Sequence, residues 1–255
     1  MENQVATHTT TESKFKFPTE MVDLPSKGLL YSEGNPLSTG QVEIKYMTAK
    51  EEDILTNQNY ITKGIVIDKL LQSLIVSPIN YDDLLIGDKN AIMLASRILG
   101  YGKDYSFTYD GENQDVDLTD FGSKYLNESL YTKGRNEFEF KLPHSGNDIT
   151  FKLLTHGDEK KIEREIQGLK KINKNTSQDL STRLKHIVTS VNGSYESKDV
   201  RDFVSNYMLA KDSRALREYI KEVQPDVDLT TTVNTFNGAE DIALPITMNF
   251  FWPDF

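Results

Sequence analysis

Hydrophobic residues recur at helical spacing in the first part of the chain. A stripe of apolar side chains three and four positions apart predicts a mostly buried helix within residues 61–76. The stripe consists of Ile67, Leu70, Leu71 and Leu74. Ser77-Pro78 ends this helix, because proline lacks the backbone N–H that a continuing helix needs.

Two further helices are predicted on either side of this one. Thr48 and Glu51 have the spacing of a capping box, so a helix is expected to begin directly after Thr48. Apolar residues surround the segment 91–99 almost completely, which predicts a helix at the centre of the core. Asp88 is the expected cap of that helix and Gly100 its C-terminal stop.

The periodicity changes from helical to alternating after residue 102. Aromatic and polar residues alternate within 103–155, which predicts strands joined by turns. Helical spacing then returns, and the predicted helices cover 158–172, 179–191, 200–209 and 212–223. The last segment alternates again and contains Asn237-Gly238, a hairpin signal.

These elements predict an α+β fold. Residues 1–23 are expected to form a mobile N-terminal arm, residues 24–102 a helical module, and residues 103–255 an α+β part. The α+β part is expected to contain a central antiparallel sheet over 103–155, a helical insertion over 156–225 and a C-terminal β-hairpin over 226–255 that returns to the sheet.

Composition narrows the class of protein. A hydrophobic fraction of 37% in 255 residues suffices for a real core. The formal net charge of -10 argues against a nucleic-acid partner, because phosphate binding depends on clustered lysine and arginine. The absence of cysteine excludes disulfides and thiolate metal sites. No apolar run reaches the roughly 18 residues of a membrane span, so we expect a soluble cytoplasmic protein.

Motifs for catalysis or cofactor binding are weak. Gly100-Tyr101-Gly102 lacks the third glycine of a dinucleotide loop and follows a predicted helix, which favours a helix stop. The histidines do not have metal-ligand spacing; they are His8, His144, His156 and His186. We therefore predict no catalytic residue, no cofactor, no metal site and no small-molecule substrate.

Charged residues also have structural explanations. Asp115 with Asp117, and Asp226 with Asp228, place carboxylates on single strand faces, but neither pair has the glycine and distal glutamate of a calcium loop. Basic residues gather within 160–174, where interleaved glutamates favour a solvated helix over a site for an acidic partner.

Aromatic residues concentrate at the C-terminus. Phe250, Phe251, Trp252 and Phe255 lie within the last six residues. Aromatic clusters are common anchors of protein interfaces, so these four residues are the candidate partner interface. The alternative is that Phe250 and Trp252 complete the chain's own core.

Several segments resemble one protein family when they are taken in order. The matching segments are Pro25-Ser26-Lys27-Gly28, Met47-Thr48-Ala49-Lys50-Glu51-Glu52-Asp53, Asp68-Lys69-Leu70-Leu71, Asp82-Asp83-Leu84-Leu85-Ile86-Gly87-Asp88-Lys89-Asn90-Ala91, Arg97-Ile98-Leu99-Gly100-Tyr101-Gly102 and Phe250-Phe251-Trp252-Pro253. In this order and spacing they resemble the baseplate hub subunit family of T-even-type contractile-tailed bacteriophages. Residues 103–225 carry little of the resemblance.

The resemblance implies a non-enzymatic baseplate hub subunit or hub assembly factor of a phage tail. Its partners would be other baseplate hub or tail proteins, met in the cytoplasm of the infected host and in the virion. Members of the family carry paired cysteines where this chain has Asp110-Gly111-Glu112-Asn113, so a zinc ribbon is not inherited. Two alternatives remain: a tail-assembly chaperone absent from the mature virion, and an enzyme with a small-molecule site between the helical module and the sheet.

Overall fold

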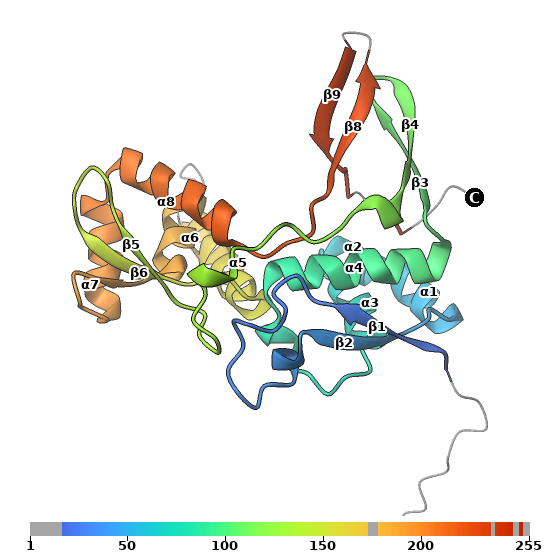
Figure 1. Ribbon diagram of the computed structural model, residues 1–255, viewed down its shortest axis with the longest axis horizontal. Coiled ribbons are helices and arrows are strands. Elements are labelled where there is room, and N and C mark those ends of the chain that lie inside the picture. Colours follow the sequence, from blue (N-terminus) through green and yellow to red (C-terminus); the bar gives the residue numbers. More distant parts are fainter. Residues whose placement is uncertain (1–16, 173–177, 236–237, 247–249, 252–255) are drawn as a thin grey trace, which may run out of the picture.

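The computed structural model describes residues 17–172, 178–235, 238–246 and 250–251, and it shows the α+β fold that the sequence predicts. The first part, which covers the described residues up to 102, contains two strands and four α-helices (Figure 1). Its elements are β1 (Thr19–Asp23), η1 (Pro36–Thr39), β2 (Gln41–Lys45), α1 (Ala49–Leu55), α2 (Gln58–Thr62), α3 (Val66–Leu74), η2 (Tyr81–Asp83) and α4 (Ile86–Tyr101).

The second part alternates between short sheets and helices. Its elements are β3 (Asp104–Tyr109), β4 (Glu112–Asp117), η3 (Leu118–Asp120), η4 (Glu128–Leu130), β5 (Phe138–Lys141), β6 (Asp148–Phe151), α5 (His156–Ile172), α6 (Asp179–Ile187), β7 (Val188–Val191), α7 (Ser197–Asp202), the π-helix η5 (Phe203–Tyr207), α8 (Ala210–Val223), β8 (Thr230–Thr235) and β9 (Gly238–Ala243).

The expected N-terminal arm is wrong for residues 19–23. These residues form β1, which pairs antiparallel with β2 from Thr19 opposite Lys45 to Asp23 opposite Gln41. Val22 is buried, so the strand contributes to the core. The sequence signal was weak because only one side chain of the strand is buried. Residues 1–16 lie outside the described part of the chain.

The expected central sheet is also wrong. Within the described residues the strands form four separate antiparallel sheets, ordered β1-β2, β3-β4, β5-β6-β7 and β8-β9. The third strand of the largest sheet, β7, was predicted as the end of a helix. Helix α6 instead ends at Ile187, and the β-branched residues of β7 pair with β6, with Val188 opposite Phe151.

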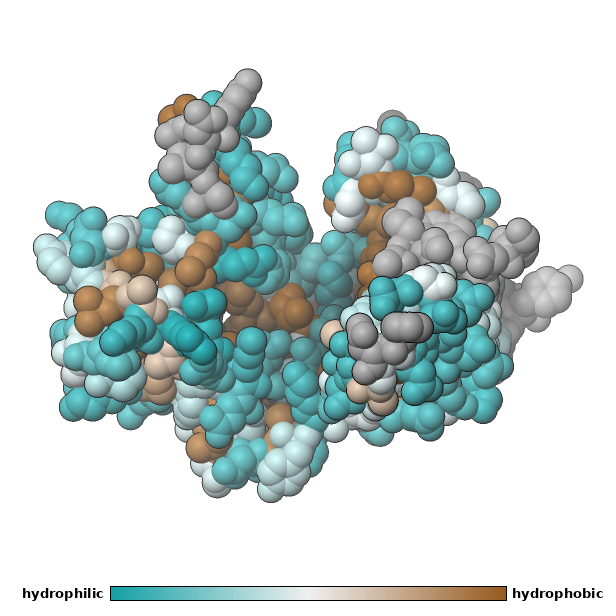
Figure 2. Space-filling view, turned by 90° about the horizontal axis from the view of Figure 1, so that it is seen from above, coloured by the Kyte–Doolittle hydropathy of each residue, from teal (hydrophilic) through white to brown (hydrophobic). Residues whose placement is uncertain are grey.

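The terminal hairpin β8–β9 does not join the sheet β5-β6-β7. It lies beside the hairpin β3–β4, where the Gln114 side chain donates a hydrogen bond to the Asn234 carbonyl at 3.1 Å. Both hairpins project from the same side of the body (Figure 1). Seen from above, hydrophobic side chains gather in the hollow between these hairpins and the part that carries α5 to α8 (Figure 2).

The two parts of the chain share one continuous hydrophobic core, which includes buried residues from Val22 to Phe251. They meet where α4 begins. The Ile86 N–H donates to the Leu154 carbonyl at 3.3 Å, and the His156 N–H donates to the Leu84 carbonyl at 2.8 Å. A Cβ atom on Gly87 would lie 1.9 Å from the Pro225 carbonyl oxygen, so only glycine allows this approach.

Candidate functional site

The turn at residues 25–28, which is the first segment of the family resemblance, is held by the buried carboxylate of Asp88. Asp88 accepts hydrogen bonds from the Ser26 N–H at 2.9 Å, the Ser26 hydroxyl at 2.7 Å and the Tyr31 hydroxyl at 2.6 Å. Burial raises the pKa of Asp88, although these bonds oppose that effect. The prediction that Asp88 caps α4 is wrong, because α4 begins at Ile86 and the Asp88 side chain binds the turn instead.

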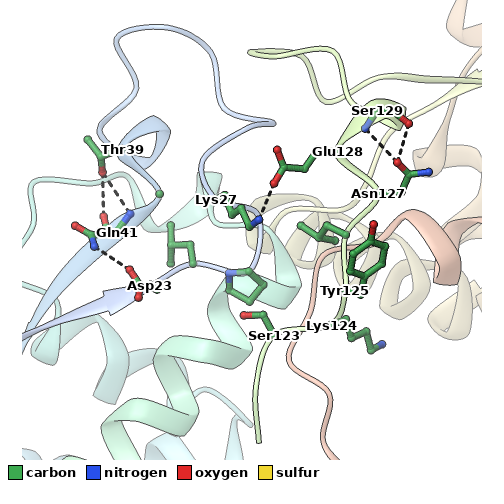
Figure 3. A pocket seen from close by; sticks show the side chains of 14 residues that line it. Asp23, Lys27, Thr39, Gln41, Ser123, Lys124, Tyr125, Asn127, Glu128 and Ser129 are labelled. Atoms are coloured by element: carbon green, nitrogen blue, oxygen red, sulfur yellow. Dashed lines mark hydrogen bonds and ion pairs between the residues drawn. The ribbon is translucent and has the colours of Figure 1, made fainter.

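A groove of about 840 Å³ runs beside this turn (Figure 3). One wall is formed by the turn and by the adjoining ends of β1 and β2, including Leu24, Pro25 and Gln41. The other wall is the segment 123–129, which belongs to the second part of the chain. Both walls offer backbone and side-chain polar groups next to apolar ones, a composition that suits protein recognition.

One ion pair crosses the groove. The Lys27 ammonium lies 2.6 Å from Glu128 Oε1, as Figure 3 shows, and more than half of each side chain is exposed. An exposed pair of this kind contributes about 1 kcal/mol or less, so a ligand can replace it at small cost. Tyr125 lines the same groove with 91% of its surface exposed. An exposed tyrosine combines a large apolar ring with a hydroxyl, and tyrosine is enriched in binding hot spots.

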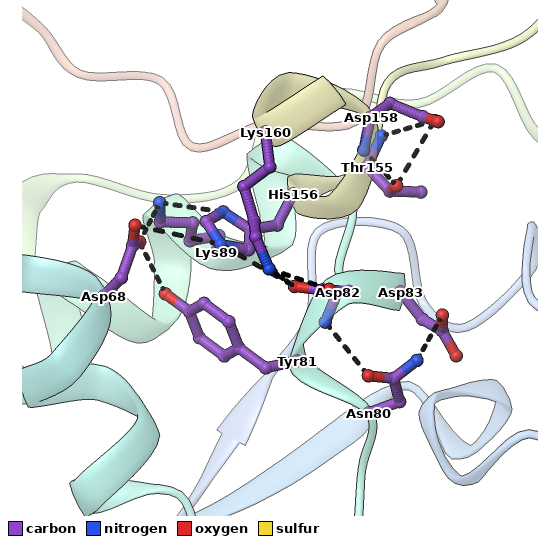
Figure 4. Close-up of polar contacts among 10 residues, drawn as sticks. All are labelled: Asp68, Asn80, Tyr81, Asp82, Asp83, Lys89, Thr155, His156, Asp158 and Lys160. Carbon is purple, nitrogen blue, oxygen red and sulfur yellow. Dashed lines mark hydrogen bonds and ion pairs between the residues drawn. The ribbon is translucent and has the colours of Figure 1, made fainter. Parts of the chain in front are cut away.

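A second polar cluster lies where the two parts of the chain meet (Figure 4). The Lys89 ammonium is 2.5 Å from Asp68 Oδ1, and the Lys160 ammonium is 2.9 Å from both carboxylate oxygens of Asp82. His156 lies between these pairs and is buried; its Nδ1 is 3.4 Å from Lys89 Nζ.

The surroundings of His156 favour its neutral form. Burial lowers the pKa of His156, and the ammonium groups of Lys89 and Lys160 act in the same direction, against the opposing effect of the Asp68 and Asp82 carboxylates. The Asp82 pKa is lowered by its hydrogen bond from Lys160. The cluster joins α3, η2, α4 and α5 through groups that bind one another.

The aromatic residues at the C-terminus divide into two groups. Phe250 and Phe251 are buried, and the Phe250 ring packs edge-on against Tyr105. These two rings therefore complete the chain's own core, so the partner-interface prediction is corrected for them. Trp252 and Phe255 lie outside the described residues.

Arg97 ties this C-terminal segment to α4. Its side chain donates to the carbonyls of Phe250 at 2.5 Å, Gly102 at 2.7 Å and Asp104 at 3.1 Å. It is 1% exposed and contacts the Tyr101 and Tyr105 rings. No motif pointed to this residue, although a single arginine in the largely apolar segment 91–99 was a usable signal.

Thr48 and Glu51 lie together at the start of α1. The Thr48 N–H and hydroxyl donate to Glu51 Oε2 at 3.0 and 2.6 Å. Glu51 is fully buried and also accepts from Lys45 at 2.8 Å and from the Ser73 hydroxyl at 2.7 Å. Burial alone would raise the Glu51 pKa, but these hydrogen bonds outweigh it and lower the pKa to about 2. The capping box thus also joins α1 to β2 and α3.

The carboxylate pairs considered for calcium partly converge. Asp115, Asp117 and Asp228 line one hollow between the two hairpins, whereas Asp226 accepts a hydrogen bond from Asn90 at 2.9 Å. Across the described ranges, no group of three or more histidine, aspartate or glutamate side chains is placed to hold a metal ion. Over the same ranges no helix is both long and apolar enough to cross a membrane.

Comparison of the chain with protein-family models, with curated proteins and with solved structures finds no match.

Proposed function

We propose that this protein is a baseplate hub subunit or hub assembly factor of a contractile-tailed bacteriophage, acting in the host cytoplasm by binding other tail proteins. The observation that carries the proposal is the position of the Pro25–Gly28 turn. This turn is the first segment of the family resemblance, and hydrogen bonds to Asp88 hold it in place. It also forms one wall of the groove that the exposed Tyr125 lines.

Physical chemistry supports binding at this groove. Two hydrogen bonds from Ser26 hold the turn to a buried carboxylate, which also accepts a bond from Tyr31. The turn is therefore already in its bound shape, so little conformational entropy is lost when a partner docks. The Lys27–Glu128 pair is exposed and weak, and the Tyr125 ring is free to contact a partner. The projecting hairpins offer further surface for neighbours in an assembly.

The test uses the phage that encodes the chain. An affinity-tagged copy produced during infection should co-purify with baseplate proteins, identified by mass spectrometry, and Tyr125→Ala should reduce that recovery about tenfold. Tyr195→Ala is the matched control, because Tyr195 is also exposed but lies on another surface. Normal virions from a phage lacking the gene would refute the proposal.

Mass spectrometry of purified virions separates a hub subunit from the tail-assembly chaperone alternative. A hub subunit appears in purified virions at fixed stoichiometry, whereas a tail-assembly chaperone is recovered from infected cells and is missing from virions. Both outcomes are read from one mass-spectrometric comparison of lysate and particle.

A further inference from the structure

Two open strand edges face each other between the projecting hairpins. Strands β4 and β8 lie on the facing sides of the two hairpins (Figure 1). Among the described residues no backbone hydrogen bond joins β4 to β8, and the Gln114 side chain reaches the Asn234 carbonyl instead. Each hairpin therefore keeps an unpaired edge, and an unpaired edge is a template for a further strand.

The register of the first hairpin shows which groups of β4 are free. The Leu118 N–H donates to the Lys103 carbonyl, so every second residue back along β4 directs its N–H and carbonyl toward β3. The residues between them direct these groups outward, toward β8. They are Asn113, Asp115 and Asp117.

The same rule identifies the outward groups of β8. The Leu244 N–H donates to the Leu229 carbonyl, which fixes the residues of β8 that pair with β9. The outward residues are Thr230, Thr232 and Asn234. The Thr230 N–H is already used, because it donates to the Asp228 carboxylate at 3.1 Å, whereas the backbone of Thr232 has no outward partner among the described residues.

A hollow of about 550 Å³ separates the two edges. Residues 115–117 of β4 and 230–232 of β8 line it on opposite sides, and residues 120–123 line the rest together with Asp228. A strand that enters this hollow meets outward backbone groups on both sides. The site therefore suits an extended chain, which binds through its own N–H and carbonyl groups.

The charge of the hollow indicates which extended chain it accepts. Four carboxylates line it, and no described residue of the lining is lysine or arginine; the carboxylates belong to Asp115, Asp117, Asp120 and Asp228. Two ammonium groups lie close by: Lys103 Nζ is 2.5 Å from Asp117 Oδ2, and Lys124 interacts electrostatically with Asp228. Carboxylates still outnumber ammonium groups, so a basic segment complements the hollow.

We infer that this hollow binds an extended basic segment of a partner protein, which adds as a strand between β4 and β8. Its backbone would bond the outward groups of Asp115, Asp117 and Thr232, and its lysine or arginine side chains would meet the carboxylates. The inference does not depend on the proposed hub function, because neither β4 nor β8 lines the groove beside Tyr125.

The probe is a labelled synthetic peptide of about ten residues in which lysine alternates with threonine or valine. Its binding to the full chain is measured by fluorescence anisotropy. One control peptide has the same sequence with alternate backbone nitrogens methylated, which keeps the charge and removes hydrogen-bond donors. Another carries glutamate in place of lysine. The basic peptide should bind saturably, and both controls about tenfold more weakly.

Two variants at one position test the strand edge. Thr232→Pro removes an outward N–H that the β8–β9 ladder does not use, so the hairpin tolerates it and peptide binding should weaken about tenfold. Thr232→Val is the matched control. It keeps the N–H and loses only the hydroxyl bond to Asp241, so it should bind the peptide as the wild type does.

A second pair of variants tests the charge. Asp115→Asn removes one carboxylate of the hollow and keeps an acceptor for the Ser106 hydroxyl, so the peptide should bind several-fold more weakly. Glu112→Gln makes the same charge change at an exposed position of β4 that does not line the hollow, and it should leave binding unchanged.

The inference fails if the basic peptide does not bind saturably or if the methylated peptide binds equally well. Undiminished binding by a Thr232→Pro variant with wild-type circular dichroism would also overturn it, and so would equal weakening by Asp115→Asn and Glu112→Gln. Self-association of the free chain that Thr232→Pro abolishes, measured by light scattering, would show that a second copy occupies the hollow instead of a partner segment.

Discussion

Two buried carboxylates in the first part of the chain, Glu51 and Asp88, have opposite charge preferences. Both are fully buried and both accept several hydrogen bonds. Glu51 has the Lys45 ammonium beside it and its pKa falls to about 2, whereas Asp88 has only neutral donors and its pKa is raised. Burial therefore does not set the charge of a carboxylate by itself. Hydrogen bonds from Lys45, Ser73 and Thr48 lower the pKa of Glu51, whereas burial and the nearby Asp226 carboxylate raise that of Asp88.

Removal of the Glu51 charge should have the largest effect on stability. Glu51→Gln leaves the largely buried Lys45 ammonium without its partner, which should cost about 3 kcal/mol in the free energy of unfolding. The loss should be read from urea unfolding at neutral pH. Glu52→Gln, an exposed glutamate in the same helical turn, is the matched control and should change little.

The Glu51 effect should also depend on pH in a defined direction. The folded-state pKa of about 2 lies below the usual 4.5, so the ionised carboxylate stabilises the fold above about pH 4.5. That stabilisation is lost as the pH falls from 4.5 toward 2. The difference between wild type and Glu51→Gln should therefore shrink in acid, and a constant difference would contradict the role given to Lys45.

Asp88→Ala should have the next largest effect. It leaves the Ser26 N–H, the Ser26 hydroxyl and the Tyr31 hydroxyl without their acceptor, which should cost about 2 kcal/mol. Asp88→Asn retains an acceptor and removes a buried charge, so it should cost less. Urea unfolding of the two variants under one condition checks this order.

The pH trend at Asp88 should be the reverse of that at Glu51. Its folded-state pKa is raised above the usual 3.8, so the protonated carboxyl stabilises the fold below about pH 3.8, and this is lost as the pH rises through the raised value. The loss in free energy of unfolding caused by Asp88→Asn should therefore be largest in acid and should become smaller toward neutral pH. The same pH trend in stability for both residues would contradict the opposite charge preferences of Glu51 and Asp88.

Tyr31→Phe should lower the free energy of unfolding by about 1.5 kcal/mol, less than Asp88→Ala does. The Tyr31 hydroxyl donates to Asp88 and accepts from the Leu85 N–H at 2.9 Å, so its loss leaves two buried groups with fewer partners. Thermal unfolding measures the loss. Tyr131→Phe provides a comparison at a half-buried tyrosine whose hydroxyl donates to the Val223 carbonyl.

Thr48→Ala should have the smallest effect, about 1 kcal/mol, because it removes one hydroxyl bond to Glu51 and keeps the Thr48 N–H bond. Thr48→Ser keeps the hydroxyl and should restore most of the loss. An unchanged unfolding midpoint in Thr48→Ala would mean that the Thr48 hydroxyl contributes nothing beyond the bonds from the Thr48 N–H, Lys45 and Ser73.

Local patterns in the sequence were sufficient to predict three helices of the first part of the chain, although α2 was missed and α6 was predicted too long. The stripe at Ile67 to Leu74 and the capping pair at Thr48 and Glu51 act within a few residues, so α1, α3 and α4 could be anticipated close to their observed bounds. The sheets depend on partners far along the chain. Val188 pairs with Phe151 and β1 with β2, and alternation alone does not identify such partners.

The candidate sites were harder to predict for the same reason. Asp88 has a position typical of a helix cap, and only the fold brings Ser26 and Tyr31 to it across about sixty residues. Tyr125 had no motif around it. Its role follows from its exposure, which is a property of the folded chain.

The close backbone contact between Gly87 and Pro225 leaves no space for a hinge motion between the two parts of the chain. The first turn of α4 and the residues after α8 touch without room for a methyl group, and the buried cluster continues across them. Neither part therefore has a hydrophobic core of its own that could stay folded when the other part unfolds. Heating should produce one cooperative transition, and a chain cut between the two parts should stay associated as paired fragments.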